Sequence, residues 1–251
     1  MVYFSRFCRI FSLMFNQSSQ TPYDLRFSLF TIPVQVHPFF WLTAIFLGLG
    51  LTRDENGAQA VHGTQVMLCW VIAVFIGVLV HELGHALTIR YLFGGYPRIV
   101  LYGLGGAAMH SPHYRRTPRM WGRILISFSG PLFGFILAGI CHMLMMGLPL
   151  DSQQVDARWF LWHILLFLYV IGIFWGIINL LPVLPMDGGH ICQEICRRFS
   201  PWRGDVLAVQ ISLFTAVGVA LLGLYFHQTF LAIMFGIMAY MNYQSLSFRR
   251  W

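Results

Sequence analysis

Six long apolar runs separated by short polar segments dominate this sequence and restrict the folds that it can adopt. A helix needs about 20 residues to cross the roughly 30 Å hydrocarbon core of a bilayer, and all the runs except the short first one are near that length. They are Pro38–Thr52, Gln65–Tyr91, Trp121–Leu148, Trp159–Leu181, Val206–Phe226 and Thr229–Leu246. Only 10% of the residues are charged, whereas a soluble domain has about a quarter. We therefore predict an all-α polytopic membrane protein with six transmembrane helices.

The arginines predict how these helices are oriented. All 16 basic residues are arginines, and 14 of them fall at the N-terminus, in the second and fourth loops with their flanks, or at the C-terminus; Arg53 and Arg158 would lie on the other face. Because cytoplasmic loops are rich in Lys and Arg, we predict a multi-pass protein with both termini in the cytoplasm. The net charge of +7 is interpreted as this topology signal, and no nucleic-acid partner is expected.

Two segments between the apolar runs have strand character. Thr31–Val36 alternates its side chains, and Tyr96–His110 begins with β-branched and aromatic residues and is interrupted by glycines, as in a hairpin. Since unpaired backbone cannot face lipid, we expect a small membrane-associated β-hairpin or sheet. The sequence has no repeat or linker, so we predict a single six-span domain over residues 31–251 after an N-terminal interfacial arm over residues 1–30.

The N-terminal arm and the cysteines suggest no chemistry. The first 25 residues hold only a short apolar run, which fits an interfacial amphipathic helix or a transit-like presequence. Five cysteines form no CxxC pair, and most lie in or beside apolar runs. We expect small buried side chains and no disulfide framework.

The strongest chemical signal is the pentapeptide His81-Glu82-Leu83-Gly84-His85 in the second apolar run. Residues four apart share one face of a helix, so the two imidazoles can converge on one metal ion. Glu82 can then act as general base on a water at that metal, as in the HExxH pattern of zinc proteases. Three ionisable side chains so close together in a membrane helix are costly and usually mark function.

Tetrahedral zinc with two histidines and a water lacks one protein ligand, and the nine acidic residues allow a search by elimination. Four lie on the external face, Asp24 lies in the N-terminal arm, and Glu194 and Asp205 lie among arginines and are interpreted as solvated charges. Asp187 remains. The fourth run ends at Pro182 and Pro185, so Asp187 arrives at a depth similar to His81 and His85. We therefore predict one zinc ion (Zn2+) per chain, bound by His81, His85 and Asp187.

Several other residues near these motifs have two interpretations or only a packing role. Asn179 is either a polar residue satisfied at a helix end or an amide that holds the substrate carbonyl or an oxyanion. His190 is either a partner of a metal ligand or an interfacial residue. The pairs Gly130/Gly134 and Gly172/Gly176 predict close approach of the third and fourth helices.

Together these motifs resemble the site-2 protease family of intramembrane zinc metalloproteases. The matching segments are His81–His85 and the stretch from Asn179 to Gly188, with Val36-His37-Pro38 and Ser129-Gly130-Pro131 as weaker matches. The resemblance covers the chain from about Thr31 to the C-terminus. It implies zinc on His81, His85 and Asp187, with Glu82 as the base. It also implies substrates that are single-pass membrane proteins, a regulatory membrane partner, and a bacterial or archaeal cytoplasmic membrane.

Two other functional classes fit parts of the pattern. A metal transporter would use the same ligands, but it has no need of Glu82 beside them, and many transporters show two repeated halves. A catalytically silent binding module would be expected to lack Glu82 or a ligand, and all four residues are present.

The strand-like segment suggests how a substrate would bind. A membrane helix must unwind before its peptide bonds can be cut, and its freed backbone groups then need partners in lipid. A sheet edge supplies them with little demand on sequence. We expect Tyr96–His110 to bind the substrate as an added strand; the alternative is a purely structural hairpin.

Overall fold

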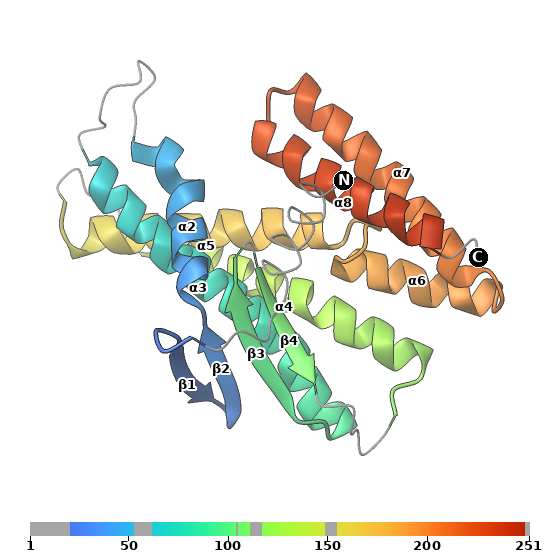
Figure 1. Cartoon of the computed structure of the whole chain (residues 1–251). Helices are drawn as coiled ribbons and strands as arrows, with labels where there is room; N and C mark the ends of the chain where they lie inside the picture. Colours follow the sequence, from blue (N-terminus) through green and yellow to red (C-terminus); the bar gives the residue numbers. More distant parts are fainter. Residues whose placement is uncertain (1–20, 53–61, 104, 111–116, 149–154, 249–251) are drawn as a thin grey trace. The chain divides into compact units, whose positions relative to one another are not determined.

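The computed structural model describes residues 21–52, 62–103, 105–110, 117–148 and 155–248 (Figure 1). The expected N-terminal amphipathic helix falls on residues 1–20, outside the described residues. The chain forms two compact units, one from residues 1–115 and 133–173 and the other from residues 116–132 and 174–251.

The first unit combines apolar helices with the sheet. Helix α2 (Pro38–Gly48) continues as the 3-10 turn η1 (Leu49–Thr52), and α3 (Gly63–Leu87) continues as the π-helical turn η2 (Thr88–Leu92). The unit also holds most of α4 (Met120–Gly147) and α5 (Ala157–Asn179). The second unit contains α6 (Asp187–Phe199), α7 (Gly204–Tyr225) and α8 (Thr229–Phe248).

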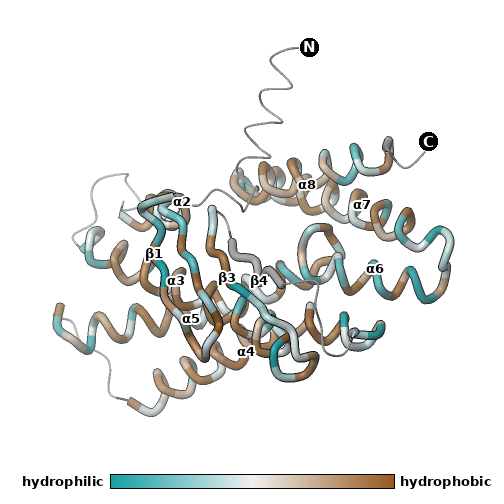
Figure 2. Tube along the Cα trace, turned by 60° about the horizontal axis from the view of Figure 1, so that its bottom comes forward, coloured by the Kyte–Doolittle hydropathy of each residue, from teal (hydrophilic) through white to brown (hydrophobic). Residues whose placement is uncertain are grey.

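Each predicted apolar run coincides with a helix, but not every helix qualifies as a membrane span. Four are long and apolar enough: Gly63–Leu92, Met120–Gly147, Ala157–Asn179 and Gly204–Tyr225. Pro38–Thr52 is a shorter apolar helix, and α8 carries Asn242, Gln244 and Ser245 in its second half. The predicted count of six is therefore not confirmed, whereas the mostly helical class is. In Figure 2 the long helices are largely hydrophobic, while α6 alternates hydrophilic and hydrophobic residues.

A four-stranded sheet lies in the order β1-β2-β3-β4. Strand β1 (Leu25–Leu29) pairs antiparallel with β2 (Ile32–Val36), which pairs parallel with β3 (Pro97–Tyr102); β3 pairs antiparallel with β4 (Gly105–His110). The segments predicted to be strands are confirmed as β2 and as the β3–β4 hairpin. Strand β1 was not expected, although Leu25, Phe27 and Leu29 alternate with the polar Arg26 and Ser28. It draws residues assigned to the N-terminal arm into the sheet.

The interpretation of Glu194 as a solvated charge is wrong. Glu194 lies on α6, a helix that the sequence did not predict, and it is 7% exposed. Its carboxylate pairs with Arg123 at 2.6 Å and with Arg197 at 3.0 Å. Arginine neighbours therefore hold this acid in a buried position between α4 and α6. Asp205 remains more exposed and accepts from Arg197 and Gln193.

The small residues of α4 and α5 allow the predicted close approach of these helices. A Cβ atom on Gly172 would lie 2.6 Å from the carbonyl oxygen of Gly134 and 3.0 Å from the Cβ of Ala138. The two backbones are thus too close for any side chain at Gly172. By contrast, a Cβ atom added to Gly139 of α4 would have no other atom within 4 Å.

These two glycines give a matched pair of alanine substitutions. Gly172→Ala should destabilise the protein by about 1–3 kcal/mol, because a packed interface must shift to accept the methyl group. Gly139→Ala should be neutral or stabilising by roughly 0.5–1 kcal/mol, because alanine replaces glycine in an open helix position. Thermal unfolding in detergent measures both. Equal unfolding temperatures for the two variants would contradict the close α4–α5 contact.

Candidate metal centre

Helix α3 presents three ionisable side chains in its last two turns. His81, Glu82 and His85 are 4%, 5% and 8% exposed, although the helix around them is almost entirely apolar. Burying ionisable groups without water is costly unless they are paired or bind a metal. Their joint burial therefore requires a specific set of partners.

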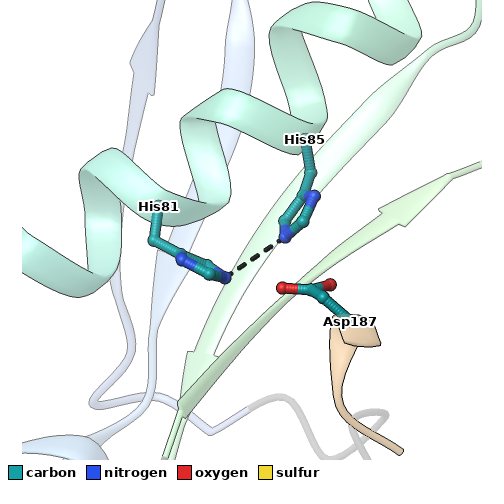
Figure 3. Close-up of side chains that lie close together, drawn as sticks. All are labelled: His81, His85 and Asp187. Carbon is teal, nitrogen blue, oxygen red and sulfur yellow. Dashed lines mark hydrogen bonds between the residues drawn. The ribbon is translucent and has the colours of Figure 1, made fainter. Parts of the chain in front are cut away.

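The two histidines point toward one another across a single helical turn (Figure 3). The Nε2 atoms of His81 and His85 are 3.2 Å apart, and the ring planes are 80° apart. Two imidazoles on one tetrahedral zinc ion, at about 2.0–2.1 Å each, would hold their nitrogens roughly 3.3 Å apart. The spacing present in the protein thus fits such an ion without rearrangement of the helix.

Asp187 is the third residue of this group. One ligand atom each from His81, His85 and Asp187 lies within 4.8 Å of the other two. Figure 3 shows the Asp187 carboxylate beside the two imidazole rings. Two imidazole nitrogens and one carboxylate oxygen form a donor set typical of catalytic zinc, which takes three protein ligands and keeps its fourth position open. The three residues singled out from the sequence as ligands are therefore those that the structure gathers.

A tight turn brings the chain to Asp187. Asp187 is the first residue of α6, and the two glycines that follow it have no room for side chains. A Cβ on Gly188 would lie 2.1 Å from the Leu180 carbonyl oxygen, and one on Gly189 would lie 2.5 Å from the Leu184 nitrogen. The first turn of α6 thus packs directly against the backbone of the segment that precedes it.

Asn179 and His190, which were also singled out from the sequence, lie outside this ligand group. Asn179 ends α5, and its side-chain amide donates to the Trp175 carbonyl oxygen at 3.0 Å, which is the bond of a polar residue satisfied at a helix end. Its role toward an oxyanion stays a prediction. His190 is exposed on the first turn of α6 and is not part of the ligand group.

Cysteine thiols do not add to this donor set. Cys69, Cys141, Cys192 and Cys196 are all free, as expected, and Cys8 lies outside the described residues. Burial and, to a lesser extent, the Cys196 sulfur 4.0 Å away together raise the pKa of the Cys192 thiol to about 11. A thiol must be deprotonated to bind a metal ion, so Cys192 stays protonated and inert near neutral pH.

Two polar residues that the sequence motifs did not indicate contact the segment before Asp187. Ser212 on α7 and Asn242 on α8 both hydrogen-bond to the backbone of Leu184. Both residues could have been identified from the sequence, because Ser212 carries a hydroxyl and Asn242 an amide inside runs that are otherwise apolar. Polar side chains in such runs need a hydrogen-bonding partner.

Comparison with known proteins adds family information to this geometry. The model of Peptidase family M50 matches residues 150–219, a segment that includes Asp187. The chain is 28% identical over 207 residues to a zinc metalloprotease of Methanocaldococcus jannaschii, which covers 80% of this chain and 54% of that protein. It is 28% identical over 160 residues to stage IV sporulation protein FB of Bacillus subtilis, covering 64% of this chain and 46% of that protein. The chain thus spans about half the length of these relatives.

A solved structure supports the same conclusion at the level of the fold. The site-2 protease from Methanocaldococcus jannaschii matches with a TM-score of 0.59 and 24% identity, over 89% of this chain and 95% of that chain. The match to the Peptidase family M50 model, the similarity to zinc metalloproteases and the fold shared with a site-2 protease all agree with the family resemblance that the sequence motifs carry.

Proposed function

We propose that the chain is an intramembrane zinc metalloprotease that hydrolyses peptide bonds within or near the transmembrane segments of other proteins. The observation that carries the proposal is the His81–His85 pair, with Nε2 atoms 3.2 Å apart in a buried part of an apolar helix and with Glu82 beside it. Its relatives are named zinc metalloproteases, and this favours zinc over other metals for the same ligands.

Each residue of the centre has a distinct task in this proposal. His81, His85 and Asp187 hold zinc, which when bound polarises a peptide carbonyl and makes a water molecule more acidic. Glu82 accepts the proton of the attacking water and returns it to the leaving amine. Asn179, at the end of α5, has a side-chain amide that can donate to the oxygen of the scissile carbonyl.

Metal binding and catalysis should separate in single substitutions. His85→Ala and Asp187→Ala each remove a ligand, so both variants should lose most of their zinc as well as their activity. Glu82→Gln keeps the size of the side chain but cannot accept a proton, so it should retain one zinc per chain and lose cleavage by a factor of at least about 10². Metal analysis and cleavage of a reconstituted membrane substrate measure both properties.

The alternatives give different results in the same experiment. A metal transporter would bind zinc through the same ligands, but the wild type would cleave nothing and Glu82→Gln would change nothing. Full zinc occupancy in both ligand variants would remove the proposed centre itself. Cleavage by Glu82→Gln at the wild-type rate would leave the centre intact and exclude Glu82 as the base.

We also propose that α2 and α8 join the four long helices as spans, with both termini in the cytoplasm of a bacterial or archaeal cell. The arginine distribution supports this orientation, because Arg90, Arg98 and Arg198 all fall on the face that would be cytoplasmic. In this arrangement α3 and α5 both run inward, so the metal centre lies in the cytoplasmic half of the bilayer.

Reporter fusions test the orientation directly. A fusion at Trp251 should be active only as a cytoplasmic reporter, and a fusion within the segment between Thr52 and Thr64 only as an external one. An external C-terminus would mean an odd number of spans and would overturn the six-span arrangement.

The sheet supports a proposal for how the substrate binds. Strand β3 is paired on both sides, whereas β4 is the last strand of the sheet, with no partner on its outer edge among the described residues. Both β3 and β4 contact α3, the helix of His81 and His85. An unwound substrate segment can therefore add to β4 by main-chain hydrogen bonds close to that helix. We expect single-pass membrane proteins as substrates, as the resemblance of the sequence motifs to the site-2 protease family implies.

This arrangement selects β4 for the test of strand addition. Val100 and Tyr102 lie on the interior strand β3, so a proline there would break the sheet itself. Neighbouring residues of a strand direct their backbone N–H groups to opposite edges, so one of Ala107→Pro and Ala108→Pro on β4 removes an outward donor. That variant should fold and bind zinc but cleave roughly tenfold more slowly, as expected for one lost hydrogen bond of about 1.4 kcal/mol.

Strand β1, at the other end of the sheet, provides the control. Phe27→Pro and Ser28→Pro form an equivalent neighbouring pair, and the outward-facing member should leave cleavage unchanged. If the well-folded β4 variant cleaves at the wild-type rate, the substrate does not pair with this edge.

A further inference from the structure

The backbone of Leu184, three residues before Asp187, is bound by side chains from two different helices. The Leu184 N–H donates to Ser212 Oγ of α7 at 3.2 Å, and its carbonyl oxygen accepts from Asn242 Nδ2 of α8 at 2.9 Å. Both side chains are buried, with Ser212 0% and Asn242 4% exposed. Both backbone hydrogen-bonding groups of one loop residue are thus satisfied from outside the loop.

These contacts are more than ordinary packing of polar residues in apolar helices. Asn242 Nδ2 also donates to the Met238 carbonyl oxygen at 2.8 Å, within its own helix. That single bond is the usual way for a polar side chain to be satisfied inside a helix. The second bond, from the same nitrogen to Leu184, serves the loop, which has no helical partner for its backbone.

The same segment is confined by apolar contacts. Val183 and Met186 belong to a buried cluster with Ala216 of α7 and Phe235 of α8. Immediately afterwards, Gly189 approaches the Leu184 nitrogen so closely that a Cβ would lie 2.5 Å from it. Leu184 is therefore fixed on one side by α7 and α8 and on the other by the first turn of α6, which begins with Asp187.

We propose that Ser212 and Asn242 are positioning residues for Asp187, so that the α7–α8 hairpin determines the geometry of the third metal ligand. The proposal deepens the proposed function, since it rests on Asp187 binding the metal. It assigns a role to two helices, adjacent in Figure 1, that contribute no ligand themselves. Loss of either hydrogen bond would free the turn and let the carboxylate leave its binding position.

Metal affinity and the spectrum of a cobalt(II)-substituted protein test this role without relying on cleavage. In the full-length chain in detergent, Ser212→Ala and Asn242→Leu should weaken zinc binding by about 10–100-fold in competition with a chelator, as for other partners of metal ligands. The intensity of the visible cobalt bands should fall as the site departs from tetrahedral geometry. Ser245→Ala is the control, because Ser245 is an exposed α8 residue that bonds only to the Met241 carbonyl oxygen.

Repeating the substitution in the Asp187→Ala variant separates a positioning role of Asn242 from general destabilisation of the fold. In Asp187→Ala, Asn242→Leu should cause no further loss of the residual cobalt affinity of the two histidines, because the residue through which Asn242 acts is gone. An equal loss in both backgrounds would mean that the substitution damages the whole fold, and the proposal would be wrong. Wild-type zinc affinity and an unchanged cobalt spectrum in both single variants would also overturn it.

Failure of the proposed function has its own signature. If the wild-type protein and Asp187→Ala bind zinc equally well, Asp187 is no ligand, and the proposal about Ser212 and Asn242 falls with the proposed centre. If the wild type binds zinc and loses it on Asp187→Ala, but the Ser212 and Asn242 variants match the wild type, only the positioning role is refuted.

Discussion

The cost of placing polar groups where water is absent determines most of this structure. An apolar helix tolerates His81, Glu82 and His85 only if something compensates their burial, and the proposed metal ion with a carboxylate ligand would do so. The same constraint applies to backbone that leaves helical geometry. The strands satisfy it by pairing in one sheet, and the turn before Asp187 satisfies it with hydrogen bonds from α7 and α8.

Features encoded over a few neighbouring residues could be predicted from the sequence. The helices follow from continuous apolar runs, and the His81–His85 pair follows from helical periodicity alone. Asp187 could be found because only nine acidic residues exist and all but one had another place. Its identification depended on the need of zinc for a third protein ligand and on elimination of the other acidic residues, because no local sequence pattern marks Asp187.

Features that depend on distant partners could not be predicted. Glu194 lies among arginines, as solvated charges often do, yet Arg123 from α4 pairs with it in a buried position. The amphipathic helix α6 was not predicted either, because its polar residues resemble those of a loop. The sequence around Glu194 is compatible with either a solvated or a buried carboxylate, and Arg123, from a segment far earlier in the chain, decides between them.

The two kinds of proposed metal ligand therefore differ in how the chain specifies their positions. His81 and His85 keep their spacing wherever α3 is helical, so a rigid local element suffices. Asp187 follows a turn interrupted by Pro182 and Pro185, and such backbone has no repeating hydrogen bonds to hold it. Its position must come from elsewhere in the chain, and Leu184 is the point where that support is visible. A centre built in this way would be loosened through Asp187 while the histidine pair on α3 stays intact. Substitutions on α7 and α8 would then change metal binding without touching a ligand.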